Sequence, residues 1–379
     1  MIRSSGRPRS AVFSSAMADN MRVLALVPSI YDTSPGQRYR IEQWQCGLKQ
    51  SGVEITFAAF EDKELRDVLY ARGQWLKKGI GISKAFIRRF STVGQSKSYD
   101  MVYVFREAAL FGPSLLERIV HLSKVPLVFD FDDAIFVRYR SPANGWLSVL
   151  KAPGKTRTIC RLASHVMVGN NYLAEYARTY NQNVTVVPTT IDTEIYRVGS
   201  VRETATPVIG WTGSYSTVQH LDLLQRILCE LARRERFRLR VIGPCDYKLE
   251  GVDVEVVPWR SQTEAQDLAE ADIGIMPLPD DQWSRGKCGC KALQYMGLGI
   301  PAVCSPVGMN TDLIRDGDNG FLATSAEEWI TKLTLLLRSA QLRKKLGLAG
   351  RKTVEERFSA ASQVPRVHEI FRSVIEGTS

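Results

Sequence analysis

Lys287 and Lys291 lie in a stretch, residues 285–310, that combines cations with helical, strand and glycine-turn patterns. If a helix begins there, the spacing of four residues puts both lysines on one face of it. Farther along, the first backbone N–H groups and the positive dipole end of a second predicted helix near Met309 would attract anions. Two ammonium groups, with Arg285 beside them, and a helix N-terminus facing one ligand predict a binding site for a diphosphate.

Three carboxylates, Asp130, Asp132 and Asp133, stand at the end of the apolar run at residues 126–131. Acidic groups crowded at a strand end could position a polar group of a substrate or stabilise charge. Their oxygen atoms could also hold a divalent cation, and at least one of them could instead cap a following helix. We therefore expect a second functional edge in the first half of the chain.

Short apolar runs alternate with longer helical segments from Met21 onward, which is typical of βαβ units with parallel sheets. The first series of predicted strands covers residues 22–27, 53–58, 101–105, 126–131, 165–168 and 184–187. The second series covers residues 207–211, 238–242, 253–257, 272–276, 301–304 and 321–323. Two series predict two α/β domains, whose ligands bind outside the carboxyl ends of the strands.

The composition favours a two-domain protein of the reducing cytoplasm. Its 379 residues, 44% of them hydrophobic, can supply two cores. No apolar run approaches the roughly 20 residues of a membrane-spanning helix. Seven scattered cysteines without a CxxC pair indicate neither a disulfide framework nor a metal site. The net charge of +10 comes without a helix-turn-helix, zinc-finger or RNA-binding signature, so we expect no nucleic-acid partner.

Residues 1–20 are basic, rich in Ser and without the apolar core of a secretory signal. We interpret them as a disordered tail or as an upstream start-site error. Residues 72–90 interleave apolar side chains with Lys and Arg. That segment could lie on an anionic membrane, at the inner face of the plasma membrane, or it could be a helix that packs its Phe and Ile residues into the first domain.

Residues 285–310 resemble the donor-site signature of the group 1, glycogen-synthase-like glycosyltransferases, which are retaining enzymes with two Rossmann-like domains facing across a cleft (the GT-B fold). Five residues match that signature in type and spacing: Met296, Gly299, Pro301, Gly308 and Asp312. Two residues depart from it, because Gly286 and Gln294 stand where the family has glutamates.

The resemblance continues at residues 208–213, which are similar to the strand and glycine turn that open the second domain of the family. Ser214 and Gln219, however, stand where many members place an Arg and a Lys against the donor diphosphate. We infer that Lys287 and Lys291 supply the missing charge for the departing nucleoside diphosphate.

The resemblance implies donor contacts over much of the second domain. The implied donor-binding residues are Gly213, Ser214, Trp259, Arg285, Lys287, Lys291, Gln294, Gly308, Met309, Asn310 and Asp312. Trp259 could stack on the nucleobase or could simply fill an edge of the core. Gln294 could still bond a ribose hydroxyl, whereas Gly286 has no side chain with which to hold the sugar.

In the first domain, Asp133 matches the Asp of the family's His-Asp pair, and Asp132 takes the place of the His. The resemblance thus implies a catalytic set of Asp132, Asp133, Lys287 and Lys291, with Asp130 on the acceptor side.

Gly36 and Arg38 resemble the glycine-containing acceptor-side loop of the family, and Arg106 belongs to the same rim. Arg38 could instead form an ion pair with Asp32 or Glu42.

The implied function is transfer of a sugar from a nucleoside diphosphate sugar to a polysaccharide, glycolipid or lipid-linked acceptor, with retention. Residues 21–198 would bind the acceptor, residues 199–350 the donor, and a helix at 351–379 would cross back, with a hinge near 195–205. No cofactor is implied, because the nucleotide sugar is a substrate, and a divalent cation is not expected. A non-catalytic nucleotide- or sugar-binding protein and a sugar-nucleotide epimerase of the same fold remain the alternatives.

Overall fold

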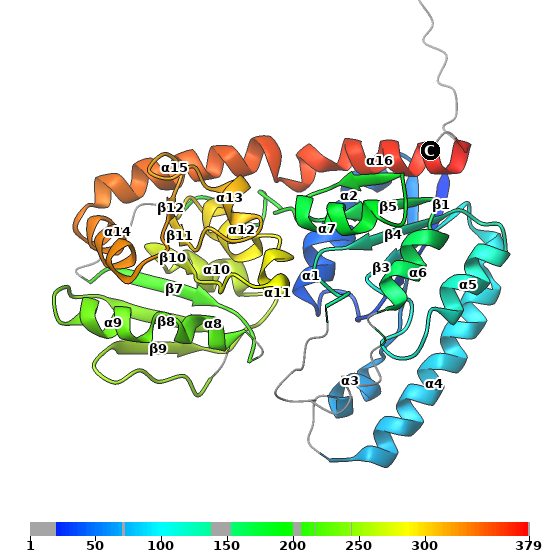
Figure 1. Cartoon of the computed structure of the whole chain (residues 1–379), viewed down its shortest axis with the longest axis horizontal. Helices are drawn as coiled ribbons and strands as arrows, with labels where there is room; N and C mark the ends of the chain where they lie inside the picture. The colour runs from blue at the N-terminus through cyan, green and yellow to red at the C-terminus, as the bar shows by residue number, and fades with distance from the viewer. Residues whose placement is uncertain are drawn as a thin grey trace, which may run out of the picture.

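The computed structural model describes residues 20–69, 73–137, 152, 154–199, 206–215, 217–243 and 245–377. In these ranges it contains two six-stranded sheets, each built only from parallel strand pairs (Figure 1). The prediction of an α/β protein with two Rossmann-like domains is confirmed, and each of the two predicted series of strands forms one sheet. Four predictions bear in part on residues outside the described ranges: the tail on residues 1–19, the basic and apolar segment on Arg72, the hinge on residues 200–205 and the last helix on residues 378–379.

The N-terminal sheet has the strand order β2-β1-β3-β4-β5-β6. Its strands are β1 (Met21–Val27), β2 (Val53–Ala59), β3 (Met101–Phe105), β4 (Leu127–Phe131), β5 (His165–Val168) and β6 (Val184–Val186). Every residue of β3 and β4 is buried, as expected for central strands covered by helices on both faces. Buried parallel strands are near-continuous apolar runs, which is why the sequence predicts them well.

The C-terminal sheet has the order β12-β11-β10-β7-β8-β9. Its strands are β7 (Val208–Thr212), β8 (Arg238–Ile242), β9 (Asp253–Val257), β10 (Ile273–Met276), β11 (Ala302–Cys304) and β12 (Phe321–Leu322). The first strand of each domain, β1 or β7, lies in the interior of its sheet and not at an edge, so later strands are added on both sides of it. The carboxyl ends of the inner strands therefore form the edge at which ligands of such sheets bind.

Helices cover both faces of each sheet. Those of the N-terminal domain are α1 (Pro35–Gln37), η1 (Arg38–Glu42), α2 (Gln43–Gln50), α3 (Lys63–Leu69), α4 (Trp75–Gly94), η2 (Ser96–Ser98), α5 (Leu115–Leu122), α6 (Lys155–Leu162) and α7 (Asn171–Arg178). The later helices are α8 (Val218–Asp222), α9 (Gln225–Ala232), α10 (Glu264–Ala269), α11 (Gln282–Arg285), α12 (Cys290–Gly297), α13 (Asn310–Leu313), α14 (Ala326–Arg338), α15 (Ala340–Arg357) and α16 (Ala360–Glu376).

The last two helices run along one edge of the molecule, α15 beside the C-terminal domain and α16 beside the N-terminal domain (Figure 1). Val367 and Phe371 of α16 are buried in one core cluster with Trp44 of α2. The chain passes between the domains at Phe358, whose carbonyl oxygen accepts a hydrogen bond from Ile191 N–H at 2.8 Å. In the described ranges, none of the helices combines the length and the apolar character needed to pass through a membrane.

Candidate functional site

The loop between α11 and α12 lies directly against the N-terminal domain. A Cβ atom on Gly286 would come within 2.6 Å of Ala134 Cβ and 2.7 Å of Ala134 N. No side chain fits there unless the domains move apart. The close approach gives a physical reason for Gly where the related signature has Glu.

Lys287 lies in this loop and not on a helix, because α11 ends at Arg285 and α12 begins only at Cys290. The expectation that Lys287 and Lys291 share one helical face is therefore wrong. Gly289 has φ +70, a left-handed conformation that separates the two helices and favours glycine. Lys287 Nζ lies 3.0 Å and 3.3 Å from the two carboxylate oxygens of Asp133, and 4.8 Å from the ring centre of Trp283.

Lys291 lies in the first turn of α12, and its Nζ is 5.7 Å from the ring centre of Trp211. Burial, followed by the charge of Lys287, lowers the pKa of Lys291 to about 8. The side chain makes no ion pair with any residue in the described ranges. A desolvated cation beside a second cation favours a bound anion.

His220 belongs to the same cluster, although sequence reasoning missed it. Burial, followed by the charges of Lys291 and Lys287, lowers its pKa to about 4, so the ring is neutral at pH 7. The signal that could have revealed it is its place next to Gln219, where related proteins carry a Lys. We call Lys287 and Lys291, with the neutral His220 beside them, the cationic cluster.

A helix N-terminus does face this region, but it belongs to α12. The first amide groups of a helix have no intrahelical acceptor, and Gly289 at the N-cap offers no side chain to satisfy them. The positive end of the α12 dipole adds to the charge of Lys291. Backbone and side chains of one segment thus favour the same anion.

The helix beginning near Met309, α13, is a single turn and serves as a support. The N–H groups of Met309 and Asn310 donate to the carbonyl oxygens of Lys287 and Val307, both at 3.3 Å. The expectation that these amides are free for a phosphate is therefore wrong. Gly308 has φ +58, and a Cβ there would lie 2.8 Å from Arg285 O.

Asp130 forms an ion pair apart from those of Asp132 and Asp133, which share Arg106. Asp130 is fully buried and forms a two-point pair with Arg40, 2.6 Å and 2.7 Å, while Tyr103 also donates to it. Burial raises the pKa of Asp130, although Arg40 opposes the shift. In the described part of the chain, no group of three or more His, Cys, Asp or Glu residues is arranged to hold a metal ion.

Asp132 pairs with Arg106 at 2.6 Å, and Arg106 also lies 3.5 Å from Asp133. The pKa of Asp132 is lowered: burial alone would raise it, but the charge and hydrogen bond of Arg106 outweigh that effect. Arg106 has φ +58, a strained conformation that non-glycine residues adopt mostly where the surroundings force it. A Cβ on Gly36 would come within 2.6 Å of Arg106 Nη2, so the glycine lets this pair approach the first loop.

Arg38 lies in ion pairs with Asp32 at 2.7 Å and with Glu264 at 2.6 Å. The surface alternative with Asp32 is thus present. Glu264 is 3% exposed and is also bonded by Tyr39 of the N-terminal domain and by Tyr196.

Gln294 and Trp259 belong to this interdomain network. Gln294 is buried and donates to Tyr39 Oη at 2.7 Å and to Glu264 at 3.0 Å. Trp259 Nε1 donates to the same carboxylate at 2.8 Å. In this arrangement both side chains face protein groups instead of an open ligand space, because Tyr39 reaches across from the first domain.

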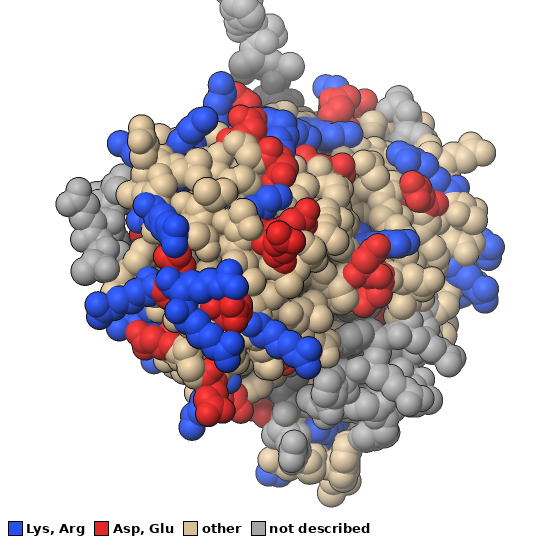
Figure 2. All heavy atoms as spheres, turned by 60° about the vertical axis from the view of Figure 1, so that its left-hand side comes forward, with Lys and Arg blue, Asp and Glu red and all other residues tan. Residues whose placement is uncertain are grey.

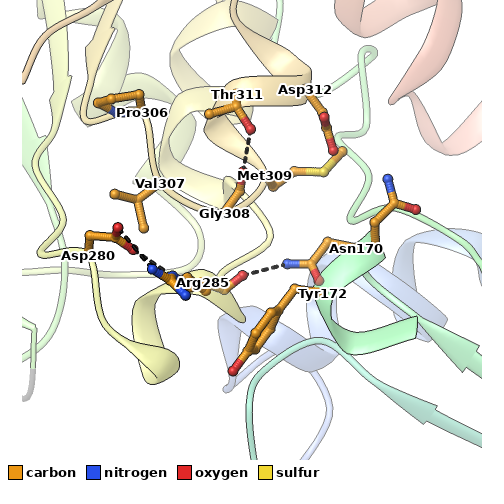
Figure 3. A pocket seen from close by; sticks show the side chains of 11 residues that line it. Asn170, Tyr172, Asp280, Arg285, Pro306, Val307, Gly308, Met309, Thr311 and Asp312 are labelled. Carbon is orange, nitrogen blue, oxygen red and sulfur yellow. Dashed lines mark hydrogen bonds and ion pairs between the residues drawn. The ribbon is translucent and has the colours of Figure 1, made fainter. Parts of the chain in front are cut away.

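A cavity of about 350 Å³ lies next to the loop between α11 and α12, and Arg285 at the start of that loop helps to line it (Figure 3). Arg285 points into it and pairs with Asp280 at 2.7 Å, so this cation is separate from the cationic cluster. Asn170, which caps α7, donates to the carbonyl oxygens of Arg285 at 3.2 Å and Lys287 at 3.1 Å. This interdomain link was missed by sequence reasoning. Asp312 also lines the cavity.

Gly213 and Ser214 form the turn after β7. A Cβ on Gly213 would come within 2.6 Å of Thr217 Oγ1, and Ser214 N–H donates to that hydroxyl at 3.0 Å.

The structure brings together only part of the predicted site. The residues that lie close to one another are Gly36, Arg106, Asp132, Asp133, Lys287 and Lys291, and His220 and the N-terminus of α12 join them.

Residues 206–339 match the family described as Glycosyl transferases group 1. In addition, 217 residues are 24% identical to D-inositol 3-phosphate glycosyltransferase of Segniliparus rotundus. This match covers 50% of the chain and 47% of the relative, so it spans about half the length of that protein.

Among solved structures, sucrose-phosphate synthase of Thermosynechococcus elongatus superposes with a TM-score of 0.69 at 13% identity, over 94% of this chain and 100% of the other. HepE of Anabaena in complex with UDP-glucose gives 0.62 at 15% identity, over 93% and 100%. At such identities the likeness concerns the fold, and it extends over both domains.

Proposed function

We propose, from the match of residues 206–339 to the group 1 glycosyltransferases and from the GT-B fold, that this chain transfers a sugar from a nucleoside diphosphate sugar to an acceptor. The observation that carries the proposal is the cationic cluster at the N-terminus of α12. Lys291 has no carboxylate partner among the described residues, and its pKa is lowered by burial. A diphosphate supplies the missing negative charge.

In the proposed reaction, the bond between the anomeric carbon and the β-phosphate oxygen breaks while the acceptor oxygen bonds to the anomeric carbon. The acceptor's proton passes to the departing phosphate, and configuration is retained. Negative charge grows on the diphosphate as the bond breaks, so Lys287, Lys291 and the α12 amide groups bind the transition state more strongly than the ground state. No resident cofactor is needed in this scheme.

Asp133 holds Lys287 in the absence of donor, and we propose that a donor phosphate replaces it. Asp133 would keep Arg106 as a partner at 3.5 Å, and Asp132 is already paired with Arg106. The two carboxylates would then orient the acceptor hydroxyl group, since carboxylates held in place by the half-buried Arg106 are fixed hydrogen-bond acceptors.

We further propose a polysaccharide, glycolipid or lipid-linked acceptor of the cell envelope and a place of action in the cytoplasm, at the inner face of the plasma membrane. The basic and apolar surface of α4 supports this assignment.

A direct test incubates the full chain with a panel of UDP-, GDP-, ADP- and CMP-linked sugars and measures the release of free nucleotide. We expect one nucleoside diphosphate sugar to be turned over, by slow hydrolysis when no acceptor is present. A protein that binds a nucleotide but never releases product would instead be the non-catalytic alternative. Conversion of one nucleotide sugar into another would indicate the epimerase.

Donor binding should weaken as the pH rises through about 8. The pKa of Lys291 in the free protein is about 8, so the side chain is charged below that pH and loses its proton above it. Binding a diphosphate to the neutral form requires proton uptake, so KM for the donor should rise by up to about tenfold per pH unit above 8. His220, with a pKa of about 4, is neutral throughout this range.

The control for this profile is Lys291→Arg, because a guanidinium stays protonated over the whole range. Its KM should depend little on pH between 7 and 9. The same rise of KM in this variant would assign the titration to another group.

A further inference from the structure

Helix α4 presents apolar side chains on two opposite sides. One side faces the N-terminal core through buried Ala85 and Val93, with the buried Arg89 between them. The opposite side carries large apolar residues with high exposure: Leu76 79%, Ile80 50%, Ile87 71% and Phe90 41%. A helix that only packed its Phe and Ile residues into the domain would not need this second side.

These exposed residues form a continuous row. Leu76, Ile80, Ser83, Ile87 and Phe90 are spaced alternately four and three residues apart, so they align along the helix. We call this row the outer stripe of α4. In Figure 1, α4 lies at the edge of the N-terminal domain on the side away from the C-terminal domain, so a partner on the stripe leaves the interdomain site accessible.

The charge on α4 has one sign. The helix has no Asp or Glu between Trp75 and Gly94. Lys77 and Lys84 follow the stripe on one flank, both exposed, and neither makes an ion pair with a described residue. Arg88 on the same flank pairs with Asp62 at 2.7 Å.

Many surface cations elsewhere have acidic neighbours. On the side shown in Figure 2, Lys and Arg are interspersed with Asp and Glu. In the C-terminal domain, Arg238 pairs with Asp253 and Arg315 pairs with Asp318. What distinguishes α4 is the combination of exposed lysines, the absence of Asp and Glu over the whole helix, and the exposed apolar stripe.

We propose that the outer stripe of α4 docks on an anionic lipid surface. Its apolar side chains would enter the boundary between headgroups and acyl chains, while Lys77 and Lys84 would contact lipid phosphates. Only the biological role of this docking rests on the proposed function, since a lipid-linked acceptor would be presented at the membrane surface. A second copy of the chain fits less well, because two paired stripes would bring like-charged lysines together with no carboxylate on α4 to neutralise them.

The test is flotation of the full chain with vesicles of phosphatidylcholine alone and of phosphatidylcholine with phosphatidylglycerol. We expect binding to the anionic vesicles only. The variant Leu76→Ser/Ile80→Ser/Ile87→Ser should lose roughly tenfold or more of the bound fraction, since affinity follows the apolar area that enters the interface. Lys77→Glu/Lys84→Glu should lower the bound fraction by a similar factor. Because Glu favours helices about as well as Lys does, this variant should keep α4 folded.

A matched control, Leu223→Ser/Leu335→Ser/Leu348→Ser, removes three leucines of the C-terminal domain that are 51%, 48% and 47% exposed. It should float like the wild type. Equal binding to both kinds of vesicle, no binding at all, or a stripe variant that floats unchanged would overturn the proposal. So would a wild-type dimer that the stripe substitutions dissociate in sedimentation. Because flotation needs no sugar transfer, its result stands whether or not the proposed reaction is found.

Discussion

Replacing Lys291 by Ala should lower sugar-transfer turnover by about 10²–10³-fold, the usual effect of removing one group that stabilises charge in the transition state. Lys291 is the cation of the cluster that has no ion-pair partner among the described residues, so its charge is available to the departing diphosphate. Steady-state kinetics over a range of donor concentrations would measure the effect, which should appear in kcat and also in KM for the donor.

Stability distinguishes this effect from misfolding. Burial disfavours the charged form of Lys291, so its removal should leave the melting temperature unchanged or raise it. Lys344→Ala, which removes an exposed lysine of the same domain, is the control and should change neither quantity. Turnover of Lys291→Ala within a few-fold of the wild type would contradict the assignment.

The largest loss of stability is expected for Asp130→Ala. Asp130 and Arg40 are both fully buried and form a two-point ion pair, so the substitution leaves an uncompensated buried charge. Breaking such a pair costs about 3–5 kcal/mol of unfolding free energy. Urea unfolding followed by circular dichroism would measure it.

Glu369→Ala on α16 is the matched control, because its partner Arg372 is 51% exposed and the pair contributes little in water. A cost for Asp130→Ala no greater than that of the control would mean that Arg40 finds another partner or reaches solvent.

The strands were predictable because burial on both faces makes each of them a short apolar run. The end of α12 was predictable for a local reason as well, since Gly299 adopts φ +72 just past the helix, where glycine is favoured. Signals of this kind depend on a few neighbouring residues and are therefore visible in a single sequence.

The partners of the charged side chains were not predictable in the same way. Lys287 and Asp133 are 154 residues apart, and Gln294 and Tyr39 are 255 residues apart. Their contacts depend on how closely the two domains approach, which no local pattern records. The helical spacing assumed for Lys287 failed because Gly289 turns the chain before α12 begins.

The central claim, that the cationic cluster binds the donor's diphosphate, is tested most directly by calorimetry with a nucleoside and its diphosphate, using the base that the nucleotide panel identifies. The wild type should bind the diphosphate at least about 100-fold more tightly than the nucleoside, as expected for two charge-assisted contacts. Lys287→Ala/Lys291→Ala should lose most of this preference, because only the α12 amide groups would still favour the diphosphate. A double variant that keeps the wild-type preference would contradict the account.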